Sequence, residues 1–426
     1  MTDAVSDRPG RRAGARARGT GFTLVTQYYP PERGAAQVRL SAIVEQLRRL
    51  GHTVDVVTAL PNYPLGRIFD GWRGRPLRRT AEDGGRVTRV WVWAAMGSGP
   101  ARIANYLSFS VMSVVGLLAT GQSGCLVIEY PTLFGALPAV VLGRLRRQRV
   151  VLLVADLWVD SIVEVGAMSD GRVVRALRVL ERWMLRRAHV VTAVTDGVRD
   201  ALLRKGVDAD RIAWLPNGAD VTTFHPGPAD DDVRADLGLE DGEHLVLYAG
   251  THGYVHGLEV VLDAAERLRG RPIRFLLVGG GSEKPELELS ARRRGLDNVT
   301  FVDPVAPSEV APLLRASVAG LATVRAGDVY RTVRSAKAVP TMACGRPVVY
   351  SADDEGSRLV REIGAGLVTP PGDGAALAEA VQQLVDDPEL AERLGRAGRE
   401  WVVANASWER LVSDWLDELS VNGASQ

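Results

Sequence analysis

The sequence predicts an α/β protein built from two Rossmann-like, parallel-sheet domains that face one another across a deep cleft. Three features support this prediction. Short apolar strands alternate with amphipathic helices along the chain, a polar segment rich in proline and glycine at 218–235 divides this alternation into two similar halves, and glycine-bearing turns follow several strands. At 426 residues the chain is also too long for one ordinary core.

The elements of the two halves follow the same pattern. The first half begins with a strand at Phe22–Tyr29 and a helix whose apolar residues recur with helical spacing up to Gly51. The other strands predicted there are Thr53–Leu60, Cys125–Tyr130, Arg149–Asp156 and His189–Thr195. Strands are predicted in the second half at His244–Gly250, Ile273–Gly281, Asn298–Asp303, Val318–Val324 and Arg346–Ser351. Such alternation is typical of parallel, doubly wound sheets.

These elements suggest four segments. We expect a disordered basic tail at 1–20, an N-terminal domain at 21–222, a C-terminal domain at 223–400 and a C-terminal helical segment at 401–426. The last segment is amphipathic over Ser407–Leu419. The sequence leaves open whether it caps the second domain or crosses back to the first.

The composition is that of a soluble globular protein. With 46% hydrophobic residues, 24% charged residues and a formal net charge of +1, nothing calls for nucleic acid or another polyanion as a partner. The basic tail lacks the apolar segment of a secretory signal. Cys125 and Cys344 lie far apart in apolar contexts, which predicts two buried thiols and a cytoplasmic location.

Two segments raise the question of a peripheral membrane contact. Ile103–Thr120 is uncharged and nearly long enough to span a bilayer, but its polar and small residues favour a packed or interfacial helix. The other segment carries arginines at helical spacing beside an apolar stripe: Arg172, Arg175, Arg178, Arg182 and Arg186 beside Val174, Leu177, Leu180 and Leu185. Such a face suits either solvent or the inner face of the membrane.

Three glycine-bearing turns lie at the carboxyl ends of predicted strands, where open α/β sheets bind ligands. In the first, Gly34 and Ala35 open a helix whose free N–H groups suit a phosphate. The second turn contains Gly250, Gly253 and Gly257, and the third contains Gly279 to Gly281. None has the pattern of a P-loop, and the first lacks the dinucleotide fingerprint. Together the turns indicate a nucleotide-linked ligand held between two domains.

Several longer segments follow one another in a specific order. They include "QYYPPERGAAQVRLSAIVEQLRRLGHTVDVVTALPNYPLGRI", "ADLWVDSIVEVGAM", "VLYAGTHGYVHGLEVVLDAA", "LLVGGGSEKPEL" and "MACGRPVV". In this order they resemble the family 4 glycosyltransferases of the GT-B fold, especially bacterial amino-sugar transferases of surface-polysaccharide synthesis. The resemblance runs from about Phe22 to Val385.

The resemblance implies a retaining, metal-independent transferase without a cofactor. Its donor, a nucleoside diphosphate sugar, would bind mainly to the C-terminal domain. Its acceptor, a glycan, a lipid-linked molecule or a small metabolite, would bind mainly to the N-terminal domain. The departing phosphate would deprotonate the acceptor, so that no separate base is required.

The resemblance also implies the residues of the site. Asp156 is the expected catalytic residue, orienting a sugar hydroxyl, and Lys337 is expected to face the diphosphate. The residues expected to bind the donor are Gly34, Ala35, Gly250, Gly253, His256, Gly279, Gly280, Arg325, Arg331, Thr332, Lys337, Pro340 and Thr341. Those expected to bind the acceptor are Tyr29, Asn62, Tyr63 and Trp158.

Two of these positions depart from the family pattern. Pro340 stands where this branch places the glutamate that binds the ribose hydroxyls, and Thr332 stands where other members carry a second acid. The lost carboxylate would contribute roughly 1.5–3 kcal/mol to ribonucleotide binding, which favours a donor without the 2′-hydroxyl, such as a dTDP-sugar. Because proline is tolerated only in the first turn of a helix, the helix within "SAKAVPTMACG" should start late or kink.

Two other functions stay open at this level. One is a degenerate transferase homologue that binds a ligand or partner without chemistry. The other is a nucleotide-sugar epimerase, whose acid/base carboxylates would come from Asp156, Glu129, Asp328 and Glu355. The segment 208–210 mimics a metal-binding Asp-x-Asp motif, but its place in a turn favours a solvated loop.

Overall fold

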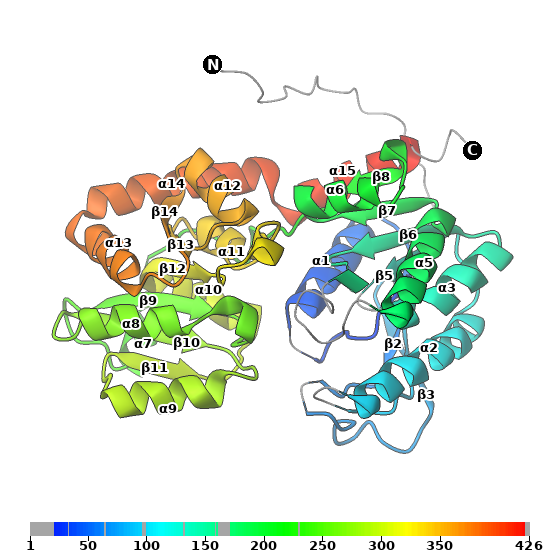
Figure 1. Cartoon of the computed structure of the whole chain (residues 1–426), viewed down its shortest axis with the longest axis horizontal. Coiled ribbons are helices and arrows are strands. Elements are labelled where there is room, and N and C mark those ends of the chain that lie inside the picture. The colour runs from blue at the N-terminus through cyan, green and yellow to red at the C-terminus, as the bar shows by residue number, and fades with distance from the viewer. Residues whose placement is uncertain are drawn as a thin grey trace.

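The computed structural model describes residues 21–32, 34–63, 65–95, 99–130, 133–157, 159–160, 171–228 and 231–421. Within these ranges the chain forms two α/β lobes, each with its own sheet (Figure 1). The predicted fold class of two parallel-sheet, Rossmann-like domains is therefore confirmed.

The N-terminal lobe contains an eight-stranded sheet in the order β3-β4-β2-β1-β5-β6-β7-β8. Its neighbouring strands run parallel except for the antiparallel pair β3–β4 at one edge. The strands are β1 (Phe22–Val25), β2 (Val54–Ala59), β3 (Leu77–Glu82), β4 (Gly85–Val90), β5 (Cys125–Glu129), β6 (Arg149–Val154), β7 (Val190–Ala193) and β8 (Ile212–Trp214).

Helices cover both faces of this sheet. They are α1 (Ala35–Arg49), α2 (Pro100–Thr120), α3 (Leu133–Leu145), α5 (Arg172–Arg187) and α6 (Asp196–Arg204). One face shares a buried core with α2, α3, α5 and α6. The other face shares a core with α1 and with α15 (Trp408–Val421) from the end of the chain.

The C-terminal lobe contains a fully parallel, six-stranded sheet in the order β11-β10-β9-β12-β13-β14. The strands are β9 (His244–Ala249), β10 (Ile273–Val278), β11 (Val299–Val302), β12 (Ser317–Thr323), β13 (Val348–Ser351) and β14 (Gly366–Thr369). The helices of the lobe are α7 (Asp231–Asp236), α8 (Glu259–Arg267), α9 (Lys284–Arg294), α10 (Pro307–Ala316), α11 (Ala338–Ala343), α12 (Glu355–Ile363), α13 (Gly374–Asp386) and α14 (Pro388–Asn405).

The chain crosses between the lobes twice, and the two crossings lie side by side. Ala219, on the way out, pairs with Ser407, on the way back. The N–H of Ala219 donates to the carbonyl of Ala406 at 2.9 Å, and the N–H of Trp408 donates to the carbonyl of Ala219 at 3.1 Å. Helix α14 continues past residue 400 to Asn405, and α15 then packs on the N-terminal lobe, as Figure 1 shows.

Four strands of the structure were not expected from the sequence. Strand β3 is polar and almost entirely exposed, so it has no apolar period to detect. Strand β8 is only three residues long. Strands β4 and β14 adjoin turn-rich segments. The two cysteines, by contrast, are buried free thiols, as predicted.

Candidate functional site

Lys337 is the centre of the candidate site. It precedes α11, and its side chain lies so close to Gly250 that a Cβ built there would be 2.3 Å from the Lys337 Cε. Its Nζ lies 5.1 Å above the ring of Tyr248 and 3.5 Å from Nε2 of His256. The residue as a whole is only partly buried, but protein surrounds the ammonium group, and this desolvation lowers its pKa to about 8. No carboxylate of the described residues lies within ion-pair distance of it.

Two of the predicted glycine turns meet beside this lysine. A Cβ on Gly279 would lie 1.8 Å from the carbonyl oxygen of Gly250, so only glycine fits there. The N–H of His252 donates to the carbonyl of Gly280 at 2.9 Å, and Gly281 packs against the backbone of His252. The turns after β9 and β10 therefore pack together into one glycine-lined wall next to Lys337.

Two histidines of the β9 turn have ring nitrogens without a partner among the described residues: both nitrogens of His252, and Nδ1 of His256. His252 is 0% exposed, and neither of its ring nitrogens has a hydrogen-bond partner among the described residues. Burial lowers the pKa of His252 to about 4 and that of His256 to about 3, and the charge of Lys337 adds to both effects. Both rings are therefore neutral near pH 7, and each carries one N–H donor. Sequence reasoning missed His252, although its place between Gly250 and Gly253 was a usable signal.

The predicted arginines are engaged by the protein itself. The guanidinium of Arg325 stacks on Tyr254 at 4.2 Å and forms an ion pair with Glu283 at 3.5 Å. Arg325 also packs against Gly257, whose φ of +54° lies in the left-handed region. Arg331 is exposed and pairs with Asp328 at 3.0 Å. Arg325 and Arg331 each form an ion pair with a carboxylate, whereas Lys337 forms none with a described residue.

Pro340 is the third residue of α11 and so lies in its first turn. The late helix start predicted from the sequence is confirmed, and no kink is required there. The hydroxyl of Thr341 donates to the Lys337 carbonyl at 3.0 Å and packs against Gly320 of β12, so it faces the sheet.

The Gly34 turn is held by a buried carboxylate. Glu32 accepts hydrogen bonds from the backbone N–H groups of Tyr29 at 3.2 Å and of Asn62 and Tyr63 at 2.7 Å. Burial outweighs these bonds and raises the pKa of Glu32 to about 7. Helix α1 starts after Gly34, and no described side chain caps its N-terminus.

Glu32 holds the backbones of three residues expected to bind the acceptor, Tyr29, Asn62 and Tyr63, but their side chains differ in exposure. Tyr29 is buried in the core beneath α1, and Asn62 is fully buried, its side chain donating to the Leu60 carbonyl at 2.9 Å. Tyr63 is partly exposed, with its ring 5.5 Å from that of Tyr28. Trp158 and the side chain of Ala35 lie outside the described residues.

The four carboxylates considered for an epimerase do not form acid/base pairs. Glu129 is buried against Arg39 at 3.6 Å and accepts a hydrogen bond from the Thr26 hydroxyl. Asp328 pairs with Arg331, and Glu355 forms an ion pair with Arg334 at 2.5 Å. Asp156 is exposed just beyond β6, at the carboxyl edge of the sheet.

Glu355 also joins the two lobes. Its carboxylate accepts from the backbone N–H groups of Asp196 at 3.1 Å and Gly197 at 3.2 Å, at the start of α6 in the other lobe. Gly197 in turn lies against Thr332, since a Cβ on Gly197 would be 2.2 Å from the Thr332 Cβ. Thr332 therefore lies where the lobes meet.

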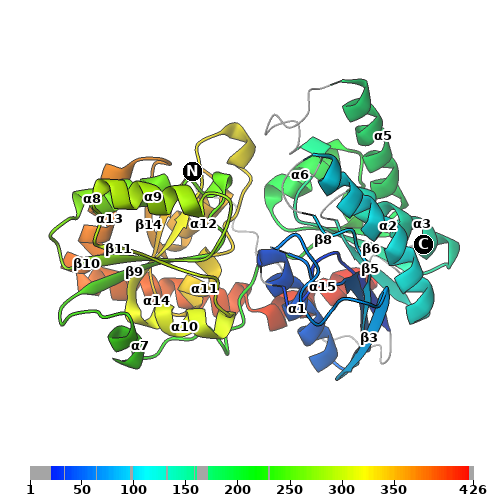
Figure 2. The ribbon, with the colours of Figure 1, turned by 90° about the horizontal axis from the view of Figure 1, so that it is seen from below.

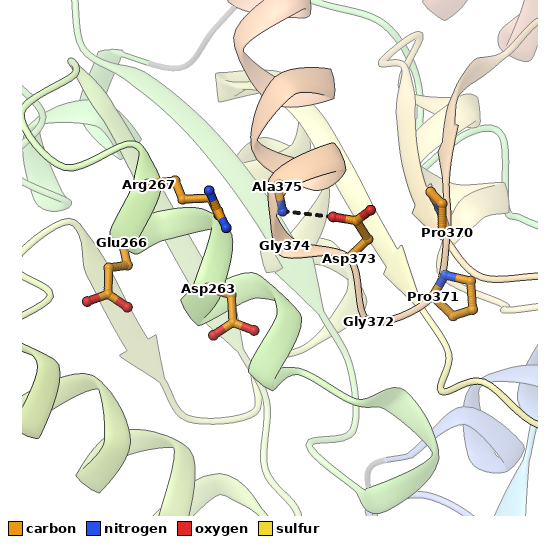
Figure 3. Close-up of a pocket in the computed structure, with 9 residues that line it drawn as sticks. All are labelled: Asp263, Glu266, Arg267, Pro370, Pro371, Gly372, Asp373, Gly374 and Ala375. Atoms are coloured by element: carbon orange, nitrogen blue, oxygen red, sulfur yellow. Dashed lines mark hydrogen bonds between the residues drawn. The ribbon is translucent and has the colours of Figure 1, made fainter.

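A hollow of about 760 Å³ lies elsewhere on the C-terminal lobe, between α8 and the start of α13 (Figure 3). The carboxylates that line it already have structural partners. Asp373 caps α13 through the N–H groups of Ala375 and Ala376, and Asp263 pairs with Arg294 at 2.6 Å. None of the predicted donor-site residues lines it.

Comparison with known proteins assigns both lobes to glycosyltransferase models. Residues 34–218 match the glycosyl transferase 4-like domain, and residues 243–387 match glycosyl transferases group 1. The chain is 30% identical over 406 residues to WcaI of Escherichia coli, a glycosyl transferase assigned to colanic acid biosynthesis, covering 92% of this chain and 97% of that protein. It is also 34% identical over 240 residues to a D-inositol 3-phosphate glycosyltransferase of Rhodococcus erythropolis, covering 54% of this chain and 52% of that protein.

Solved structures share the fold. Sucrose-phosphate synthase from Thermosynechococcus elongatus superposes with a TM-score of 0.75 at 23% identity, covering 96% of this chain and all of that one. HepE of Anabaena, solved in complex with UDP-glucose, superposes with a TM-score of 0.69 at 17% identity, covering 94% of this chain and 99% of that one.

Proposed function

The chain belongs to the glycosyltransferases of the two-lobed GT-B fold, and from this premise we propose that it is a retaining, metal-independent enzyme of the cytoplasm. Its donor is a nucleoside diphosphate sugar, and its acceptor is a glycan, a lipid-linked molecule or a small metabolite. The observation that supports the donor class best is Lys337, a desolvated ammonium without a carboxylate among the described residues, beside two glycine turns.

Desolvation explains why this arrangement points to an anion. A charge removed from water is costly unless an opposite charge or hydrogen bonds compensate it. A diphosphate beside Lys337 supplies that charge. Donors to its oxygens come from the ring of His252 and from Nδ1 of His256, which have no hydrogen-bond partner among the described residues. The complex of HepE with UDP-glucose supports this donor class by analogy of fold.

The same groups can assist the chemical step. When the bond between the sugar and the diphosphate breaks, negative charge grows on the leaving phosphate, and Lys337 stabilises it in place. Lys337 thereby provides the positive charge that a metal ion provides in other transferases. The departing phosphate accepts the acceptor's proton on the same face of the sugar, and Asp156 orients a sugar hydroxyl.

The N-terminal lobe supplies the other wall of the site. The N-terminus of α1 at Gly34, which no described side chain caps, directs its first N–H groups toward an approaching phosphate. Closure of the lobes over the donor excludes the water that would otherwise hydrolyse it. Pro340 in place of a ribose-binding acid favours a deoxyribonucleotide donor such as a dTDP-sugar.

A panel of nucleotides tests this proposal through the melting temperature of the protein. UDP, GDP, ADP, dTDP and their sugars are added singly, and a ligand present at 100 times its dissociation constant stabilises the fold by roughly 2.7 kcal/mol. We expect at least one of them to raise the melting temperature. If none does at millimolar concentration, the donor class is wrong. If one does but no sugar is transferred to any acceptor, a degenerate homologue explains the chain better.

A further inference from the structure

Helix α2 buries several polar residues beside Phe109 and Leu117 and exposes a row of apolar ones, which is unusual for a helix that faces water. Its buried face includes Asn105, Ser110, Ser113 and Thr120. Its outward face, named here the α2 stripe, consists of Ile103, Leu107, Val111, Val115 and Leu118, which are 42% to 66% exposed. These five follow one another at three- or four-residue spacing, so they lie on one side of the helix.

The buried polar residues of α2 are satisfied inside the lobe. The side chain of Asn105 accepts from Gln27 at 2.6 Å and donates to the Trp93 carbonyl at 2.8 Å. The hydroxyl of Thr120 donates to the carbonyl of Gly116 at 2.8 Å and accepts from the hydroxyl of Thr88 at 3.0 Å. These partners fix which side of α2 faces the sheet, so the α2 stripe cannot turn inward without breaking them.

Neighbouring helices extend this apolar surface. Helices α2, α3 and α5 cover the same face of the N-terminal sheet, and Figure 2 shows them together on the outer side of that lobe. At the end of α3, Leu145 is 76% exposed. On α5, Val173, Val179 and Trp183 are exposed, and Arg187 stacks on Trp183 at 5.5 Å.

The exposed charges of the same three helices have one sign. Helices α2 and α3 contain no acidic residue, and the single acid of α5, Glu181, is buried against Tyr130 and Lys205. Exposed arginines lie among the apolar side chains of α3 and α5: Arg144, Arg172, Arg175, Arg182, Arg186 and Arg187. The surface is therefore apolar on α2 and mixed apolar and cationic on α5.

We propose that the outer face of α2, α3 and α5 docks on an anionic lipid bilayer. The α2 stripe and Trp183 enter the boundary between headgroups and acyl chains, and the arginines pair with lipid phosphates. A second copy of the chain is a poorer partner, because a symmetric contact would set these arginines against their own copies. Helix α2 is long and apolar enough to span a bilayer by length and composition, but it packs against α3, β2 and β4, so it lies on the membrane as part of the lobe.

The experiment is cosedimentation of the full chain with vesicles of phosphatidylcholine, alone or mixed with phosphatidylglycerol. We expect binding to the mixed vesicles that weakens at high salt and is much weaker on pure phosphatidylcholine. The variant Leu107→Gln/Val111→Gln/Leu118→Gln should bind about tenfold more weakly or worse, because it removes the inserted apolar side chains. The variant Arg172→Gln/Arg175→Gln/Arg182→Gln should bind about a hundredfold more weakly, at roughly fivefold per arginine.

Matched controls lie on the other lobe. Val403→Gln, an exposed valine of α14, and Arg292→Gln/Arg293→Gln, exposed arginines of α9, should leave vesicle binding unchanged. The melting temperature of each variant shows that it folds. The proposal is overturned if the parent chain binds neither kind of vesicle, or if the α2 and α5 variants bind as the controls do. It is also overturned if the α2 variant changes the oligomeric state instead, since the stripe is then a protein interface. Because no nucleotide is present, none of these outcomes depends on the proposed sugar transfer.

Discussion

The two lobes differ in whether their desolvated charged groups have partners within the protein. In the N-terminal lobe Glu129 is paired with Arg39, Glu181 is bound by Lys205 and Tyr130 at 2.6 Å each, and Glu32 is bound by three backbone amides. In the C-terminal lobe the Lys337 ammonium lies beside Nε2 of His256 and above the ring of Tyr248, and no acid of the described residues pairs with it. A charge that the fold has paired is structural, whereas one left without a counter-charge points to a ligand that provides it.

Arg39→Met should have the largest effect, because it leaves the Glu129 carboxylate buried without its cation. We expect the free energy of unfolding to fall by about 3 kcal/mol, as for a broken buried ion pair. Denaturant titration measures this loss. The double variant Arg39→Met/Glu129→Leu should recover most of it; if it does not, the pair is not what holds this region.

Lys337→Met should stabilise the fold rather than destabilise it. Removing a desolvated ammonium should raise the free energy of unfolding at pH 7 by about 2 kcal/mol, while nucleotide binding weakens by about a hundredfold. The folded pKa of about 8 lies below the usual value for lysine of 10.5. The unfolded chain therefore holds more protons between these pH values, and the stability of the parent protein should rise with pH across that window. The variant should lack this rise. A variant that is less stable and binds nucleotide normally would remove Lys337 from the site.

Glu32→Gln should remove a pH dependence of the opposite sign from the parent protein. Since burial raises the pKa of Glu32 from 4.5 to about 7, the folded protein holds more protons in that window, and its stability should fall as pH rises through it. Relative to the glutamine variant, the parent protein should lose about 2 kcal/mol between pH 4.5 and pH 8. Melting curves of both proteins across this range test it, and parallel curves would show that the carboxylate is not desolvated.

Pro340→Glu should have the smallest effect, a gain of binding. A carboxylate restored in the first turn of α11 should bind ribose hydroxyls and favour UDP or GDP over dTDP by about tenfold. Pro340→Gln is the control for loss of the proline ring. Calorimetric titration measures the preference, and equal gains for ribo- and deoxyribonucleotides would contradict a ribose contact.

The sequence could predict what depends on local patterns. The ten apolar strands, the glycine turns and the first-turn position of Pro340 follow from periodicity and backbone rules applied over a few residues. The polar edge strand β3 carries no such pattern. Contacts across long separations could not be predicted in this way. Glu32 with Asn62, Glu355 with the start of α6, and the buried polar residues of α2 depend on which partners the fold supplies. For the same reason, the burial of Tyr29 and Asn62 could not be predicted from their neighbours in the sequence.

Proton uptake on donor binding tests the central claim most directly. At pH 8 about half of the Lys337 side chains are neutral, and a bound diphosphate should raise the lysine pKa, so that about half a proton is taken up per site. Calorimetric titration of UDP-glucose and dTDP-glucose in two buffers of different ionisation enthalpy measures this number, because neither nucleotide sugar titrates near pH 8. The account predicts uptake by the parent protein for whichever of the two binds, and none by Lys337→Met. Tight binding by the parent protein without proton uptake would contradict it.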